Sequence, residues 1–179
     1  MAHFPVFLDL KGKTVLIVGN TPEAQRKAAI LAPFQPEIRF LSELSAEDLT
    51  PLPALVILTG ENRREASQLC RDRNIPVNSA DDPQHCTFFF PSVICRGDMT
   101  IGISSGATAP AASAAVRRQI ESALPENLEQ ILLWLSQLTA FLRREVPDPS
   151  RRAKLLADIS AESFQKNRPL TGDELQTYM

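Results

Sequence analysis

The chain has 179 residues, of which 22% are charged, and a formal net charge of −2, which argues against the basic surface of a nucleic-acid-binding protein. Its three cysteines lack C-x-x-C spacing, so neither a disulfide framework nor a zinc site is indicated. No apolar run reaches the roughly 18 residues of a membrane span, so we expect a cytoplasmic protein without a membrane or nucleic-acid partner.

Strand-like and helical segments alternate along the first half of the chain. Residues 15–18 and 54–60 are apolar runs that end at glycine, which is typical of buried parallel strands. Further strands are predicted over residues 37–43 and 75–82, and helices over 23–31 and 61–74. This order predicts an α/β fold with a parallel sheet covered on both faces.

The pattern changes after Asp82. Residues 88–95 and 99–104 are two strand-like runs around a turn and predict an antiparallel hairpin. Leucine and isoleucine recur at helical spacing from Leu128 to Leu142, and the last residues, 167–179, are polar and expected to be loosely held. We expect further helices over 110–124 and, shorter, over 148–160.

Residues 14–31 have the outline of a strand, a tight turn and a helix that hold a dinucleotide phosphate. In the full fingerprint, three glycines make the turn, admit the pyrophosphate and allow close helix packing. Gly19 takes the first role, Ala24 is small enough for the third, and Thr21 stands where the second glycine belongs. The Thr21 side chain would crowd the place where a pyrophosphate meets bare backbone.

The same residues make a good helix start. Thr21 suits the N-cap and Pro22 the first helical position, so the free N–H groups and the positive dipole end would survive. Two details oppose an anion there: the Thr21 hydroxyl would satisfy one donor, and Glu23 adds a negative charge. The motif alone therefore favours a nucleotide site and an empty capped helix equally. The candidate cofactor-binding residues are Gly19, Asn20, Thr21, Pro22, Glu23, Ser42, Glu43, Thr59 and Gly60.

The central stretch VNSADDPQHCTFFFPSVICRGDMTIGISSGATAPAASAAVRRQIE, residues 77–121, is more specific. It resembles the siroheme synthase N-terminal module, the precorrin-2 dehydrogenase/sirohydrochlorin ferrochelatase family, whose members carry a similar VN..D.P..C.F.FPS...RG...I.IS..G.SP..A..+R..IE run. The opening HFPVFLDLKGKTVLIVG and the A.RKA..L segment after the turn also look like that family. The resemblance covers roughly residues 3 to 145.

The resemblance implies a Rossmann-like, NAD-binding domain over residues 1–87, a dimerisation segment over 88–124 and a helical domain over 125–179. It implies a homodimer that oxidises precorrin-2 to sirohydrochlorin with NAD, and in several members also inserts Fe²⁺. Two alternatives stay open: a chelatase of the same fold that has lost dehydrogenase activity, and a non-catalytic protein that binds tetrapyrrole or nucleotide. Departures from the family pattern at residues 19–21 and 59–61, on the nucleotide side, suggest the first of these alternatives.

The resemblance puts the family's proposed catalytic aspartate at Asp81, at the end of the fourth predicted strand. Ligands of open α/β sheets bind beyond the carboxyl ends of the strands, and a carboxylate there could take the proton released on dehydrogenation. It could also receive pyrrole protons during metal insertion or hold Fe²⁺ briefly. From the residues alone, Asp81-Asp82-Pro83 favours a turn with an Asx cap; with the resemblance, we expect Asp81 to be catalytic.

The implied tetrapyrrole substrate carries eight carboxylate arms, so its cleft should be locally basic, and Arg96 and Arg117 are candidates to bind them. Ser104, Ser105 and Thr108 could hydrogen-bond the same arms, or only cap the following helix. We expect a surface position for His85, packing for Cys86 and for the phenylalanines at 88–90, and no resident metal.

Overall fold

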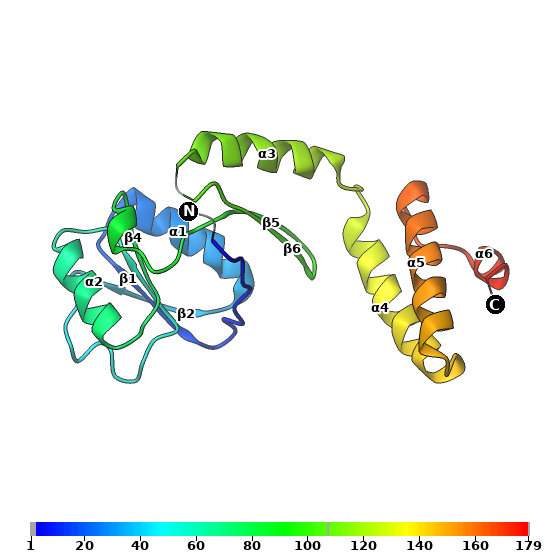
Figure 1. The fold of residues 1–179 in the computed structure, drawn as a ribbon, viewed down its shortest axis with the longest axis horizontal. Coiled ribbons are helices and arrows are strands. Elements are labelled where there is room, and N and C mark those ends of the chain that lie inside the picture. The colour runs from blue at the N-terminus through cyan, green and yellow to red at the C-terminus, as the bar shows by residue number, and fades with distance from the viewer. Residues whose placement is uncertain (1–2, 107, 179) are drawn as a thin grey trace. The chain divides into compact units, whose positions relative to one another are not determined.

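The computed structural model describes residues 3–106 and 108–178. In this part of the chain, four strands form a parallel sheet in the order β2-β1-β3-β4 (Figure 1). The strands are β1 (Thr14–Val18), β2 (Glu37–Leu41), β3 (Leu55–Leu58) and β4 (Val77–Ser79). The predicted α/β fold with a parallel sheet is confirmed, and the carboxyl ends of all four strands meet at one edge.

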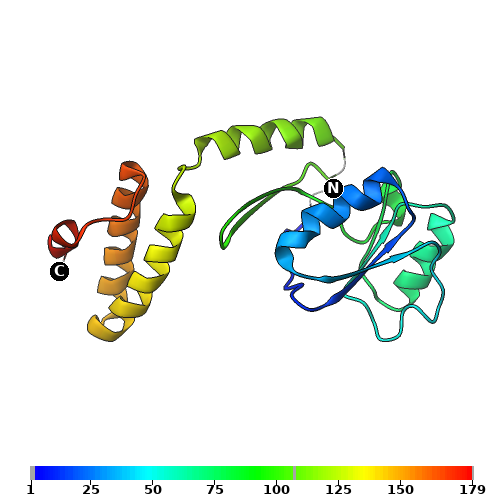
Figure 2. The same ribbon diagram turned by 180° about the vertical axis from the view of Figure 1, so that it is seen from behind.

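Two helices, α1 (Pro22–Leu31) and α2 (Arg63–Asp72), cover opposite faces of this sheet (Figures 1 and 2). Successive side chains of a strand point to opposite faces, so a strand buried on both sides needs a continuous apolar run. The α1 face holds Val15, Ile17, Leu55 and Ile57, and the α2 face holds Leu16, Val18, Val56 and Leu58.

Several strands are shorter than predicted, β4 and β5 most of all. β4 ends at Ser79 and does not continue to residue 82, because Asp81 takes a left-handed backbone conformation with φ 57°. The hairpin consists of β5 (Ser92–Arg96) and β6 (Met99–Ile103), so the predicted strand over residues 88–95 is wrong in its first half. The phenylalanines at 88 and 90 instead pack on the α1 side of the sheet, as expected of core residues.

The chain divides into two compact units. The first spans Met1–Ser92 and Gly102–Ala114, and the second spans Val93–Ile101 and Ala115–Met179. The hairpin and α3 (Pro110–Ala123) contribute residues to both units. The sheet with α1 and α2 lies in the first unit, and the remaining helices lie in the second.

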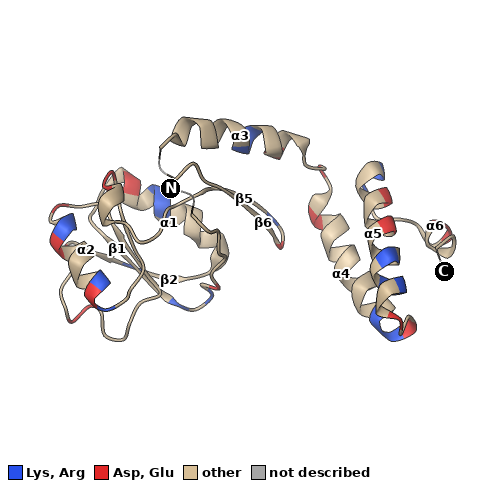
Figure 3. Cartoon of the chain, in the orientation of Figure 1, with Lys and Arg blue, Asp and Glu red and all other residues tan. Residues whose placement is uncertain are grey.

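The second unit has its core between α4 (Leu128–Glu145) and α5 (Pro149–Lys166). Leu138 and Leu142 of α4 pack with Leu155 and Ile159 of α5, which confirms the predicted leucine stripe. The helix predicted over 148–160 is longer than expected and ends where Asn167 turns left-handed. Figure 3 shows charges of both signs along α5. In the described residues, no helix combines the length and apolarity that a membrane crossing requires.

The C-terminal residues are more ordered than predicted. They form α6 (Gly172–Gln176), which starts in a capping box between Thr171 and Glu174. The Glu174 carboxylate also accepts hydrogen bonds from Lys166 (2.7 Å) and Arg168 (2.8 and 2.9 Å), which tie α6 to the end of α5. Leu170 is buried in the same core, so a polar composition did not mean a loose tail.

Candidate active site

The turn after β1 packs directly on the end of β3. Gly19 has φ 104°, and a Cβ there would lie 2.5 Å from the backbone nitrogen of Gly60. The Thr59 hydroxyl donates to the Val18 carbonyl at 3.0 Å, which fixes the two loops together. The need for glycine at position 19 therefore comes from the neighbouring strand as well as from the tight turn.

Thr21 caps α1, as the sequence indicates. Its Oγ1 accepts a hydrogen bond from the Ala24 N–H at 3.1 Å, and Pro22 occupies the first helical position. Among the described residues, the N–H groups of Asn20, Thr21 and Glu23 have no hydrogen-bond partner. The helix start therefore keeps backbone donors that an anionic group can use.

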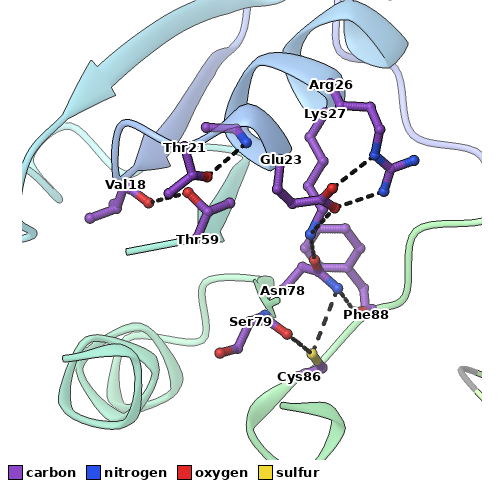
Figure 4. Close-up of polar contacts among 11 residues, drawn as sticks. Val18, Thr21, Glu23, Arg26, Lys27, Thr59, Asn78, Ser79, Cys86 and Phe88 are labelled. Carbon is purple, nitrogen blue, oxygen red and sulfur yellow. Dashed lines mark hydrogen bonds and ion pairs between the residues drawn. The ribbon is translucent and has the colours of Figure 1, made fainter. Parts of the chain in front are cut away.

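The negative charge of Glu23 is compensated on its own helix. Arg26 donates two hydrogen bonds to its carboxylate, at 2.7 and 2.8 Å, and the Lys27 ammonium lies 3.6 Å from Glu23 Oε1. The Arg26 hydrogen bonds hold the pKa of Glu23 below its ordinary value. Figure 4 shows the Glu23 side chain directed toward these two cations. The charge that counted against an anion at the turn is thus largely neutralised.

Lys27 is a buried cation that sequence analysis missed. Only 4% of the residue is exposed, and its Nζ donates to Asn78 Oδ1 at 2.7 Å (Figure 4). The same Nζ stands 5.2 Å from the centroid of the Phe90 ring. Burial lowers the pKa of its ammonium group. A signal was present in the sequence, because Lys27 shares a helix face with the apolar residues Ala24 and Leu31.

Asn78 links β4 to the segment that follows it. While its oxygen accepts from Lys27, its Nδ2 donates to the Phe88 carbonyl at 3.1 Å and contacts Cys86 Sγ at 3.6 Å. Cys86 Sγ also accepts from the Ser79 N–H at 3.1 Å, and burial raises the pKa of this thiol. Cys86 packs and bonds locally, as predicted.

A pocket of about 250 Å³ lies at the carboxyl end of β4. Asp81 lines it with an exposed side chain that makes no hydrogen bond within the described part of the chain, so the alternative of an Asx cap at this residue is not realised. The adjacent Asp82 is engaged, because its Oδ2 lies 2.7 Å from Nδ1 of a half-buried His85. The pocket is lined by Glu23, Arg26, Lys27, Asn78, Ser79, Ala80, Asp81, Asp82, Pro83, Cys86, Phe89, Phe90 and Pro110.

Apart from Asp81 and Glu23, the candidate residues lie outside this lining. Ser42 and Glu43 are exposed just after β2, whose last carbonyl, at Leu41, accepts from the Gly19 N–H at 2.8 Å. They therefore follow the strand next to the β1 turn, where a ribose-binding group is expected.

The hydroxyl candidates hold the loop before α3. Ser105 Oγ accepts from the Ala109 N–H at 3.2 Å, Thr108 Oγ1 donates to the Ser105 carbonyl at 2.6 Å, and Ser104 Oγ accepts from the Gly106 N–H at 3.1 Å. These contacts lie within the loop itself, and none of them is to an N–H group of α3 (Pro110–Ala123).

Both arginine candidates belong to the second unit. Arg96 ends β5, and Arg117 on α3 pairs with Glu121 at 2.6 Å. Their part in binding a substrate stays a prediction.

A parallel sheet with free helix-start donors and a pocket at the ends of its strands defines a Rossmann-like ligand-binding protein. Residues 42–92 match a family model described as "Putative NAD(P)-binding". The solved structure "SirC, precorrin-2 dehydrogenase" shares this fold, with a TM-score of 0.70 over 98% of this chain and 96% of that one, at 18% identity.

Curated proteins of similar sequence identify the family within this class of Rossmann-like proteins. A siroheme synthase of Thioalkalivibrio sulfidiphilus is 28% identical over 94% of this chain and 40% of its own length. One from Neisseria meningitidis serogroup B is 31% identical over 72% of this chain and 31% of its own length. The chain thus spans less than half of these relatives. It belongs to the siroheme synthase N-terminal module family.

Proposed function

We propose that this chain is an NAD-dependent precorrin-2 dehydrogenase that forms sirohydrochlorin in siroheme biosynthesis. The observation that carries the proposal is the free carboxylate of Asp81 in a pocket that also reaches Glu23 at the start of α1. The Asp81 carboxylate and the helix start with its free backbone donors belong to one compact unit, which supports a shared role.

The residues of the β1 turn fit a dinucleotide. The N–H groups of Asn20, Thr21 and Glu23 would hold its pyrophosphate at the positive end of α1. Ser42 and Glu43, after the adjacent strand, would hold the ribose. The candidates that shape the turn itself are Gly19, Pro22, Thr59 and Gly60. When bound, NAD supplies the hydride acceptor.

Asp81 would act as the general base. Dehydrogenation removes a proton along with a hydride, and an exposed carboxylate without another partner is free to accept that proton. Arg96 and Arg117, with the hydroxyl groups of Ser104, Ser105 and Thr108, remain candidates for binding the substrate carboxylates.

Insertion of Fe²⁺, as a second substrate, is the second candidate activity. The observation that favours it is the same unpaired Asp81 carboxylate, which can receive the protons that leave the pyrrole nitrogens when a metal enters. We further propose a cytoplasmic homodimer that associates through residues 88–124. In that segment, Val116 on α3 leaves 42% of its surface exposed.

Two assays with the purified chain test these activities. In the first, precorrin-2 and NAD⁺ are mixed with the protein, and we expect NADH and sirohydrochlorin to form together. In the second, sirohydrochlorin and Fe²⁺ are supplied, and siroheme is measured against a protein-free control. Absence of NADH in the first assay overturns the dehydrogenase proposal. Siroheme formation without NADH formation would instead identify a chelatase.

A further inference from the structure

The ammonium group of Lys27 is buried with incomplete pairing. An ammonium has three N–H donors, and its hydrogen-bond partner in the described residues is the neutral Asn78 Oδ1, at 2.7 Å. The Glu23 carboxylate lies at 3.6 Å, beyond a normal hydrogen bond, and already accepts two hydrogen bonds from Arg26. The ammonium group therefore keeps N–H donors that a further anionic partner could use in addition to Asn78, Glu23 and the Phe90 ring.

This cation lines the same pocket as Asp81. Phe89, Phe90 and Pro110 supply apolar wall, and Arg26 adds a second cation. The volume of about 250 Å³ is below the range of roughly 300–1,000 Å³ for pockets that enclose a whole ligand. The pocket therefore suits a short side arm that ends in an anion, with its methylene groups against the aromatic rings.

The position of Lys27 separates this anion from the cofactor pyrophosphate. The free N–H donors are those of Asn20, Thr21 and Glu23, before and within the first turn of α1. Lys27 follows Glu23 by four residues, about 6 Å further along the helix at 1.5 Å per residue. Its side chain extends toward Asn78 on β4, with the ammonium group beside the Glu23 carboxylate (Figure 4).

We propose that the Lys27 ammonium binds a carboxylate arm of the tetrapyrrole in this pocket and so holds the macrocycle beside Asp81. The inference rests on the proposed function for the identity of the ligand. Glu23 competes with the incoming carboxylate for the same cations, so it weakens binding. Neutralising Lys27 and neutralising Glu23 therefore have opposite effects on affinity.

The test is equilibrium binding of sirohydrochlorin to the full chain without NAD⁺, followed by ligand fluorescence. We expect Lys27→Met to weaken binding at least about tenfold, the size of one lost charge-assisted hydrogen bond. Glu23→Gln should tighten it about threefold, because an exposed competing ion pair is weak. Lys13→Met removes an exposed lysine outside the pocket lining and should leave affinity unchanged.

Two results overturn the inference: wild-type protein that does not bind sirohydrochlorin, or a folded Lys27→Met protein that binds within twofold of wild type. Thermal unfolding establishes that the variant is folded; if it is not, unchanged affinity in Glu23→Gln overturns the inference instead. Binding of sirohydrochlorin can be measured without turnover. The Lys27 proposal and the dehydrogenase proposal can therefore be refuted independently of each other. NADH formation with Lys27-independent binding refutes only the inference, whereas Lys27-dependent binding without NADH formation refutes only the dehydrogenase.

Discussion

Gly19 and Gly60 pack backbone against backbone where β1 and β3 end, so that a Cβ on Gly19 would lie 2.5 Å from the Gly60 nitrogen and 2.8 Å from its Cα. The obstacle is main chain, which cannot rotate away as a side chain can. The left-handed φ of 104° adds strain for any residue with a Cβ.

Gly19→Ala is therefore expected to lower the free energy of unfolding by about 2–3 kcal/mol, measured by urea denaturation. The matched control is Gly12→Ala, since Gly12 also has a positive φ, of 66°, but a Cβ at that position would meet no other atom within 4 Å. That change should cost about 1 kcal/mol, the strain alone. Equal losses in the two variants would contradict the role given to the Gly60 contact.

Asp81→Asn should reduce precorrin-2 oxidation about 10²–10⁴-fold, the contribution of a general base. Because the Asp81 side chain is exposed and has no hydrogen bond in the described residues, its thermal unfolding midpoint should not change. Asp82→Asn is the control: it weakens the contact with His85 and should affect stability more than rate. Full activity in Asp81→Asn would remove the proposed base.

Thr21 connects helix stability to cofactor affinity. Thr21→Ala loses the cap on Ala24 and should cost about 1 kcal/mol, whereas Thr21→Gly should cost only a few tenths. Calorimetric titration with NAD⁺ should show tighter binding to Thr21→Gly than to wild type, because the backbone donors become more accessible. Unchanged or weaker affinity would mean that the threonine side chain does not crowd the pyrophosphate.

The contact between α5 and α6 should weaken in acid. Hydrogen bonds from Arg168 and Lys166 hold the pKa of Glu174 well below the 4.5 of an unpaired glutamate. A pKa lowered by folding stabilises the fold above the unpaired value, and this stabilisation declines as pH falls below it. The stabilisation that Glu174 provides is therefore lost progressively as the pH falls below about 4.5.

Glu174→Gln measures this effect directly. At about pH 7 the variant should unfold at a lower temperature than wild type, and the difference should shrink at about pH 4 and in high salt. Fluorescence of Trp134, which packs against the core of the same unit, reports the transition. Asp173→Asn, at an exposed neighbour, controls for the loss of one acidic charge. A difference that does not depend on pH would refute the role of Glu174.

Features set by neighbours in the sequence could be predicted. Thr21 and Pro22 define the start of α1 through local capping chemistry, and the structure confirms it. The apolar runs of β1 and β3 also identified strands buried on both faces, because no half-exposed strand tolerates so continuous a pattern.

Features that depend on contacts between residues far apart in the sequence could not be predicted. The predicted loose tail was wrong because the partners of Glu174 lie on α5 and in the connecting loop, and composition does not reveal such contacts. The strand expected at residues 88–91 failed for a similar reason: the Phe88 carbonyl bonds to the Asn78 side chain rather than to a neighbouring strand. In the site, sequence analysis predicted that Asp81 lies at the carboxyl ends of the parallel strands, where ligands bind. It gave Lys27 no functional role.

The hydrogen bond between Lys27 and Asn78 joins residues 51 positions apart, and Asn78 is bonded in turn to Phe88. Contacts this distant form late in folding, because a long loop must close before they can form. During synthesis, the wall of the pocket cannot be complete until the ribosome has released the chain past Pro110. A nascent chain that stalls before this point would contain Asp81 without the later residues that line its pocket.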